Sequence, residues 1–162
     1  MLLLGCLLSS YVGDAACHLS VIHNSNKMKY YHGTEKKFDK EISGPPPSIN
    51  VNKGGGEIGK GFYTTNDPWI AVTWAKGRYG NEASVLEIEL GNYSLDSLLI
   101  KTKEELIEIW KRLKKAKTTK THVFGTDIVN APFATIDSAR QYKFESNKAQ
   151  IELNKCTINK IL

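Results

Sequence analysis

The chain has 162 residues, of which 41% are hydrophobic and 24% are charged. This composition suits one globular domain with a real core and excludes wholesale disorder. The net charge of +5 is compatible with an anionic partner such as a nucleotide, a nucleic acid or a membrane surface, although a solvated basic face explains it more simply.

The first 27 residues differ from the rest. They contain a short apolar run that no Lys or Arg precedes, which departs from the pattern of a secretory signal. The run is too short to span a membrane, so we expect no stable membrane insertion. We interpret residues 1–27 as a leader or as a start assigned upstream of the true one. A secretion signal comes second and a structural helix third; "LLGC" at residues 3–6 is only loosely similar to a lipoprotein cleavage box, because the segment before Cys6 is too short. We expect one domain over residues 28–162.

The cysteines indicate neither a disulfide framework nor a metal site. Cys6, Cys17 and Cys156 are odd in number and lack the paired spacing of zinc ligands. We therefore expect free thiols in a reducing compartment and no bound metal.

The first predicted elements are a strand, a short helical turn and a long loop. Residues 27–34 have the aromatic and β-favouring composition of a strand, and residues 35–42 suit one helical turn. Residues 43–61 contain three prolines and six glycines, which exclude a helix or a central strand. A loop of this length in a compact domain is usually functional or disordered.

A strand and a helix follow this loop. Residues 62–65 suit extended structure. A helix should then begin near Pro68, because Asn66 or Asp67 can cap it and proline suits the first helical turn. Apolar residues alternate with glutamates over residues 85–90, which predicts a half-buried strand. Residues 94–100 fit a strand or a turn.

The second half is predicted to hold one amphipathic helix and several strands. Thr102 and Glu105 match a capping box at the start of a helix over residues 102–117, and lysines gather at its end. We expect a strand, a turn and a strand over residues 122–133, and further strands over residues 141–146 and 149–162. Without regular alternation of strands and helices, this order favours an α+β fold with a mixed or antiparallel sheet.

Two glycine-containing motifs resemble those of the ADP-ribosyltransferase fold. They are "YYHGT" at residues 30–34 and "GKGFYTTNDPWIAVTWA" at residues 59–75, separated by the Gly/Pro-rich loop and followed by a late "AQIELNKCTINKIL". The chain is most similar to the His-Tyr-Glu branch, which includes poly-ADP-ribose polymerases and diphtheria-type toxins. Within that branch it resembles the small bacterial domains of the DUF3990 group, which often carry a glutamine at the third motif. The resemblance covers residues 28–162 and implies a split mixed or antiparallel sheet with a few helices.

The resemblance implies an enzyme that cleaves NAD and transfers ADP-ribose. His32 would bind the ribose beside the adenine, and the backbone of Gly33 would bind the nicotinamide carboxamide. Tyr63 and Trp74 would lie against the two faces of the nicotinamide ring, which suits a planar cationic pyridinium.

Three further features belong to the implied NAD site. Thr34 and Gly61 complete the set of binding residues, and residues 44–58 would form a flexible lid. Ala71 stands where polymerase-type members carry a serine that bonds the carboxamide, so one contact with NAD would be lost there.

The third motif leaves two alternatives. Against the polymerase pattern, Gln150 takes the place of the glutamate. Against the arginine-modifying toxins, Glu152 is the catalytic residue and Gln150 positions the acceptor. On a strand both side chains would point to the same face and reach the cleft. With Gln150 as the motif residue, transfer of a single ADP-ribose is favoured over extension of a polymer.

The expected function is therefore that of a monomeric, NAD-dependent mono-ADP-ribosyltransferase, cytoplasmic or secreted or injected as a toxin or effector. NAD is its substrate, and its acceptor is an unknown macromolecule, protein or nucleic acid. One alternative is a catalytically weak or inactive module that binds NAD or a partner. A weaker alternative is a nucleic-acid-binding protein that uses the basic helix over residues 102–117.

Overall fold

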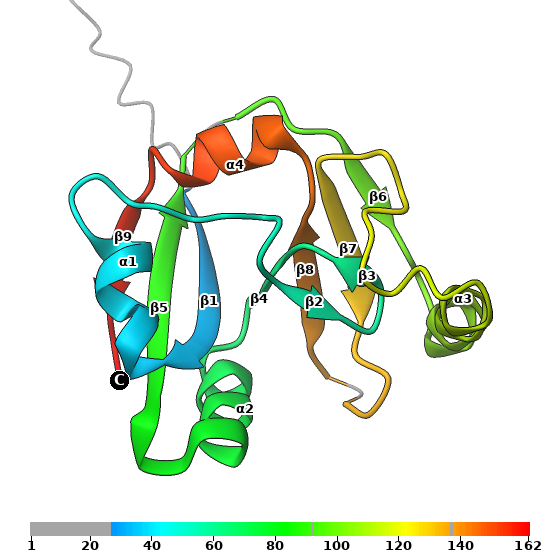
Figure 1. Ribbon diagram of the computed structural model, residues 1–162, viewed down its shortest axis with the longest axis horizontal. Helices are drawn as coiled ribbons and strands as arrows, with labels where there is room; N and C mark the ends of the chain where they lie inside the picture. The colour runs from blue at the N-terminus through cyan, green and yellow to red at the C-terminus, as the bar shows by residue number, and fades with distance from the viewer. Residues whose placement is uncertain (1–26, 92, 137) are drawn as a thin grey trace, which may run out of the picture.

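The computed structural model describes residues 27–91, 93–136 and 138–162. Apart from Lys27, the expected leader lies outside the described residues. Within them, the α+β prediction is confirmed: a mixed sheet of seven strands, in the order β6-β7-β8-β4-β1-β5-β9, is combined with short helices (Figure 1). The strands of this sheet are β1 (Met28–Glu35), β4 (Phe62–Thr65), β5 (Ala83–Leu90), β6 (Ser97–Leu99), β7 (Ile128–Pro132), β8 (Arg140–Phe144) and β9 (Thr157–Lys160).

The remaining elements surround the sheet. A two-stranded hairpin consists of β2 (Gly55–Gly56) and β3 (Gly59–Lys60). The helices are η1 (Lys36–Phe38), α1 (Asp39–Ser43), α2 (Pro68–Tyr79), η2 (Gly80–Glu82), α3 (Lys103–Lys115) and α4 (Asn147–Leu153). No helix in the described ranges is both long and apolar enough to cross a bilayer.

The large sheet is almost divided in two between β1 and β4. β1 pairs with β5 along its whole length, from Met28 opposite Leu90 to Glu35 opposite Ala83. With β4, in contrast, β1 shares the single pair of Tyr31 and Thr65. The halves β9-β5-β1 and β4-β8-β7-β6 therefore diverge on one side of this pair, and α4 lies across one end of both (Figure 1).

Helices α2 and α3 form where the sequence predicts them, because side chains cap both N-termini. The Asp67 carboxylate accepts from the backbone N–H of Trp69 at 2.8 Å, and Thr102 Oγ1 accepts from the N–H of Glu105 at 3.2 Å. In return, the Glu105 carboxylate accepts from the N–H of Lys101 at 2.9 Å. These contacts satisfy backbone donors that a helix start leaves without partners.

The strand expected over residues 149–162 is wrong in its first half. Residues Asn147–Leu153 form helix α4, and the strand is limited to Thr157–Lys160. Ser146 caps the helix, because its Oγ accepts from the N–H of Ala149 at 2.9 Å. Ala149 and Leu153, one helical turn apart, are buried in the main core. Gln150 and Glu152 therefore do not share the face of a strand.

The expected strand–turn–strand over residues 122–133 is half correct. Ile128–Pro132 is strand β7, but residues 122–124 form no strand. The backbone N–H groups of Phe124 and Thr126 donate to the Glu145 carboxylate, at 3.1 and 3.5 Å, rather than to a neighbouring strand.

The long Gly/Pro-rich loop is tied to the core in its middle. Ile49 and Val51 are buried in the main core cluster, beside residues of α4. The Asn154 side chain pairs with the backbone of Ile49 in both directions, at 2.6 and 3.1 Å. The loop is therefore anchored at Ile49 and Val51, whereas residues 45, 46, 48, 50 and 52–56 are exposed.

Candidate functional site

A cavity of about 680 Å³ lies where β1 and β4 diverge. Its walls come from β1, η1, α1, β4, α2, the loop over residues 48–57, Gly61, three residues after β7 and one residue of β8. Its volume falls within the range of sites for small molecules and cofactors. Six of the predicted NAD-binding residues line it: His32, Gly33, Thr34, Gly61, Tyr63 and Trp74.

His32 connects the two halves of the sheet through its side chain. Its Nδ1 lies 2.7 Å from the carbonyl oxygen of Tyr63 and must donate the hydrogen bond, because a carbonyl can only accept. Its ring stacks on Phe62 with 4.2 Å between the centroids. Burial lowers the pKa of His32 to about 4, although the hydrogen bond to Tyr63 acts in the opposite direction. The imidazole is therefore neutral at physiological pH, with Nε2 as a hydrogen-bond acceptor.

The Tyr63 ring is held by the β2–β3 hairpin. Its hydroxyl donates to the carbonyl of Gly59 at 2.6 Å, and burial raises the pKa of the phenol. A Cβ atom at Gly56 would lie 2.7–3.1 Å from three atoms of the ring, so only glycine fits against it without a shift. The phenol hydroxyl therefore stays protonated, and the ring lines the cavity in a fixed position.

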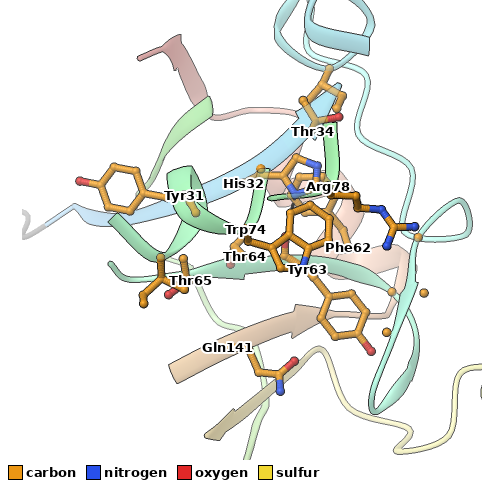
Figure 2. A pocket seen from close by; sticks show the side chains of 18 of the residues that line it. Tyr31, His32, Thr34, Phe62, Tyr63, Thr64, Thr65, Trp74, Arg78 and Gln141 are labelled. Carbon is orange, nitrogen blue, oxygen red and sulfur yellow. Dashed lines mark hydrogen bonds between the residues drawn. The ribbon is translucent and has the colours of Figure 1, made fainter. Parts of the chain in front are cut away.

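Helix α2 forms a further wall of the cavity. A Cβ atom at Gly33 would lie 2.9 Å from the carbonyl oxygen of Ala71 and 3.0 Å from the Trp74 ring, so the missing side chain lets this helix pack directly on β1. Trp74 is 49% exposed although it lines the cavity. The Arg78 guanidinium lies over its ring, 5.5 Å from the centroid (Figure 2).

Gln141 enters the same cavity from β8, and the sequence analysis missed it. The side chain is 3% exposed, and the residue stands opposite Thr65 in the register of β8 with β4. Its Nε2 donates to the Glu57 carboxylate at 3.0 Å and to the carbonyl of Pro132 at 2.9 Å. The cavity thus contains an amide and a carboxylate in direct contact.

Gln150 and Glu152, the predicted third-motif residues, do not line this cavity. Gln150 Oε1 accepts from the backbone N–H of Val51 at 3.0 Å, so the side chain holds the long loop. Glu152 forms an ion pair with Lys155 at 2.7 Å and faces a separate small cavity of about 180 Å³. The interpretation of residues 149–162 as a strand placed both residues wrongly.

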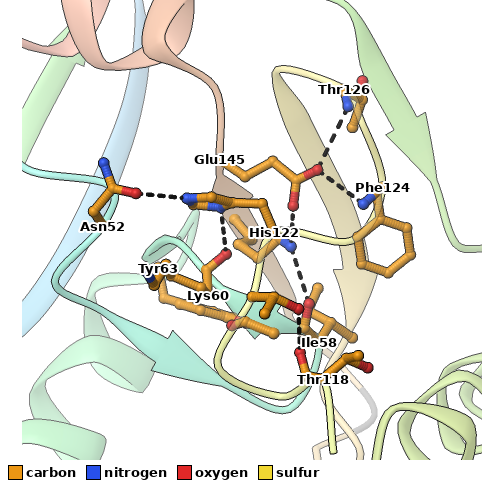
Figure 3. Close-up of polar contacts among 12 residues, drawn as sticks. Asn52, Ile58, Lys60, Tyr63, Thr118, His122, Phe124, Thr126 and Glu145 are labelled. Atoms are coloured by element: carbon orange, nitrogen blue, oxygen red, sulfur yellow. Dashed lines mark hydrogen bonds and ion pairs between the residues drawn. The ribbon is translucent and has the colours of Figure 1, made fainter. Parts of the chain in front are cut away.

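A buried ion pair between Lys143 and Glu145 holds the turn between β2 and β3 in place. The Lys143 ammonium is bonded to the Glu145 carboxylate and donates to the carbonyl of Ile58 at 2.9 Å. Both side chains are almost completely buried. Burial lowers the pKa of Lys143, whereas the contact with Glu145 acts in the opposite direction. The network fixes residue 58, directly after Glu57 (Figure 3).

His122 holds the outer side of the same hairpin. Its Nδ1 lies 3.1 Å from the carbonyl oxygen of Lys60, and its Nε2 lies 2.9 Å from the side-chain oxygen of Asn52 (Figure 3). The backbone N–H of Lys60 also donates to the carbonyl of Thr121 at 2.9 Å. The segment after α3 therefore orients the hairpin that carries Gly56 and Glu57.

The described residues contain no group of three or more His, Cys, Asp or Glu side chains that could hold a metal ion. The side chains available in the cavity are aromatic rings, hydroxyls, one neutral imidazole, two amides, two carboxylates and the cations Lys53 and Arg78. Such a site suits binding of a planar cationic ring and polarisation of sugar hydroxyls.

Comparison of the chain with protein-family models gave no match. Comparison with the curated proteins gave no match either. A function for the chain is therefore inferred from the residues that line the cavity and from the motif resemblance in the sequence.

Proposed function

We propose that the chain is an NAD-dependent mono-ADP-ribosyltransferase. In this reaction the bond between nicotinamide and ribose is cleaved, and ADP-ribose passes to an acceptor on a protein or a nucleic acid. The observation that carries the proposal is that His32, Tyr63 and Trp74, which come from two separate sequence motifs, line one cavity of suitable size. A role as a toxin or effector would follow from the choice of acceptor.

The nicotinamide end would lie between the aromatic residues. Tyr63 and Trp74 stand on different walls of the cavity, and Gly33 lies beside Trp74 (Figure 2). Aromatic faces attract a planar cation, so the pyridinium of NAD would be bound better than neutral nicotinamide. This difference would favour release of the product.

The sugar and phosphate groups would meet the polar residues of the cavity. The free Nε2 of His32 can accept a hydrogen bond from a ribose hydroxyl. Arg78 lies at the cavity beside Trp74, where its guanidinium can bind a diphosphate through charge-assisted hydrogen bonds. We assign to Gln141 the third position that the sequence analysis gave to Gln150 or Glu152, because Gln141 reaches the cavity.

The test combines binding and turnover. Isothermal titration with NAD and an assay of nicotinamide release should show binding and cleavage by the wild type. We expect strong loss of affinity in His32→Ala and Tyr63→Ala. Unchanged affinity in folded variants of both residues would contradict the proposed site.

Helix α2 offers a matched pair of tryptophans for the same experiment. Trp74 lines the cavity, whereas Trp69, five residues earlier on α2, is 76% exposed and does not line it. Trp74→Ala should weaken NAD binding, and Trp69→Ala should leave it unchanged. Equal effects of the two substitutions would show that the aromatic wall is not specific to the cavity.

A second candidate is a module that binds NAD without turnover. The neutral amide of Gln141 favours it, because an amide can orient hydroxyls but cannot offset the charge of an oxocarbenium ion. Release of nicotinamide by the purified wild type distinguishes the two functions. Binding without release would support the second candidate.

A further inference from the structure

We propose that Glu57, from the long loop, is the catalytic carboxylate of this cavity, and that Gln141 holds it in position. The inference rests on the proposed function. β8 contains no acidic residue, so the negative charge in the cavity would come from the long loop, which the sequence predicts to be a lid.

The first observation is the contact between the two residues. Gln141 Nε2 donates to Glu57 Oε2 at 3.0 Å and to the carbonyl of Pro132 at 2.9 Å, so both protons of the amide nitrogen are used. The amide is anchored on β8 and is buried. A hydrogen bond from a neutral amide orients the carboxylate without cancelling its charge.

The second observation is that both neighbours of Glu57 are fixed. Gly56 lies against the ring of Tyr63, and a Cβ atom there would come within 2.7 Å of it. Ile58 is fully buried, and its carbonyl accepts from Lys143 at 2.9 Å. The carboxylate is therefore presented from a short segment that is held on both sides, as precise positioning of a catalytic group requires.

The third observation is the contrast with Glu41, the other carboxylate in the lining. Glu41 is bonded to Lys53, so its charge is balanced by an ammonium, and its side chain is 43% exposed. Glu57 is partly buried and directly follows Gly56, which lies against the Tyr63 ring. Of these two, Glu57 is the one that can act on positive charge inside the cavity.

Glu57 assists the cleavage of NAD and the transfer of ADP-ribose that follows it. The bond between ribose C1′ and the pyridinium nitrogen breaks, and its electron pair stays on nitrogen, so nicotinamide leaves as a neutral molecule. C1′ carries positive charge until a lone pair of the acceptor bonds to it, as in glycoside cleavage. Glu57 stabilises that charge and takes the proton that the acceptor loses, which then passes to water.

The decisive variant is Glu57→Gln, because glutamine keeps the shape and an oxygen that still accepts from Gln141. A residue that only holds the loop would tolerate this change. We expect nicotinamide release to fall about 100- to 1000-fold, the usual loss for one charge-stabilising group, while the Kd for NAD changes far less. Glu108→Gln, an exposed carboxylate on α3 paired with Lys111, is the matched control and should keep wild-type turnover.

A double variant tests whether the charge itself is what matters. Glu57→Gln combined with Gln141→Glu exchanges the amide and the carboxylate across their hydrogen bond. We expect it to recover part of the turnover that Glu57→Gln loses. Recovery supports a requirement for negative charge at this place, and no recovery in a folded, NAD-binding protein speaks against it.

The outcomes separate this inference from the proposed function. A wild type that cleaves NAD together with a fully active Glu57→Gln variant would overturn the role of Glu57 and leave the transferase intact. A wild type that binds NAD without cleaving it would overturn the role of Glu57 and support the binding module. A wild type that does not bind NAD would overturn the proposed function, and the role of Glu57 with it.

Discussion

His32 donates from Nδ1 to the carbonyl of Tyr63 over 2.7 Å, and this hydrogen bond joins β1 to β4 beyond the one backbone pair that they share. The two residues are 31 positions apart in the chain. The bond therefore fixes the relative orientation of the two motifs that line the cavity, and it holds only one tautomer of the imidazole.

Acid should destabilise the protein partly through His32. Its pKa is about 4 in the folded protein against an ordinary value of 6.5, so the unfolded chain binds more protons between these values. The contribution of His32 is complete above about pH 6.5 and is lost as the pH falls towards 4. We expect His32→Gln, which cannot gain a proton in this window, to show a smaller difference between its Tm values at pH 7.5 and pH 5 than the wild type.

Phe62→Leu is the control for this measurement. It removes the ring that stacks on His32 but keeps the imidazole itself. Phe62→Leu should lower Tm at both pH values. The difference between its Tm at pH 7.5 and at pH 5 should stay larger than the difference in His32→Gln. An identical pH dependence in the wild type and His32→Gln would contradict the assigned burial of His32.

Gly33→Ala should destabilise the protein and disturb the aromatic wall. The new methyl group would come within 2.9–3.1 Å of Ala71, Trp74 and Ala75, so α2 must move away from β1. We expect a loss of about 1–3 kcal/mol in the free energy of unfolding, as for other overpacked sites, measured by urea denaturation.

Gly77→Ala is the matched control on the same helix. A Cβ atom at Gly77 meets nothing within 4 Å, and the residue lies inside α2. Alanine favours a helix over glycine by about 0.8–1.0 kcal/mol, so this variant should be as stable as the wild type or more stable. If both substitutions destabilise the protein equally, the close packing of α2 on Gly33 is not the cause of the loss in Gly33→Ala.

Lys143→Met should be more harmful than the double variant Lys143→Met/Glu145→Gln. Removal of the ammonium alone leaves the buried Glu145 carboxylate without its cation, which typically costs about 3–5 kcal/mol. In the double variant no buried charge remains, and the glutamine oxygen can still accept from the N–H of Phe124. Urea denaturation of both variants at pH 7 gives the comparison, and a double variant less stable than the single one would contradict it.

Gln150 should contribute to stability rather than to turnover. Gln150→Ala removes the acceptor of the buried Val51 N–H, which should lower the free energy of unfolding by about 1–3 kcal/mol. Gln150→Glu keeps an acceptor and should be nearly neutral. Nicotinamide release per folded molecule should stay close to the wild-type rate in both variants; a large loss of turnover at unchanged stability would restore Gln150 as a site residue.

Several parts of the site could be predicted from the sequence because their determinants are local. The cap at Asp67 and the spacing of Ala71 and Ala75 place α2. Strand β1, which carries His32 and Gly33, and the glycine-rich turn before Tyr63 likewise depend on neighbouring residues. All of these residues except Asp67 and Ala75 line the cavity.

Helix α4 and Gln141 were missed for different reasons. In α4, Ala149, Ile151 and Leu153 alternate with polar residues as they would in a strand, whereas the cap at Ser146 and the four-residue spacing of the buried Ala149 and Leu153 indicate the helix. No local pattern distinguishes Gln141 from the neighbouring residues of β8. It reaches the cavity because β8 pairs with β4, which is far away in the sequence.

The sequence by itself determined the α+β class, the capped helices α2 and α3 and the two motifs around His32 and Tyr63, since caps, turns and apolar periodicity act over a few residues. The tertiary structure decided which polar side chains meet in the cavity. Gln141 and Glu57 are 84 positions apart. They come into contact only because the strand order places β8 beside β4, and because the carbonyl of the buried Ile58 accepts from Lys143 of β8 and so holds the loop there. Contacts of this kind depend on packing across the whole chain, so no local pattern of residues specifies them.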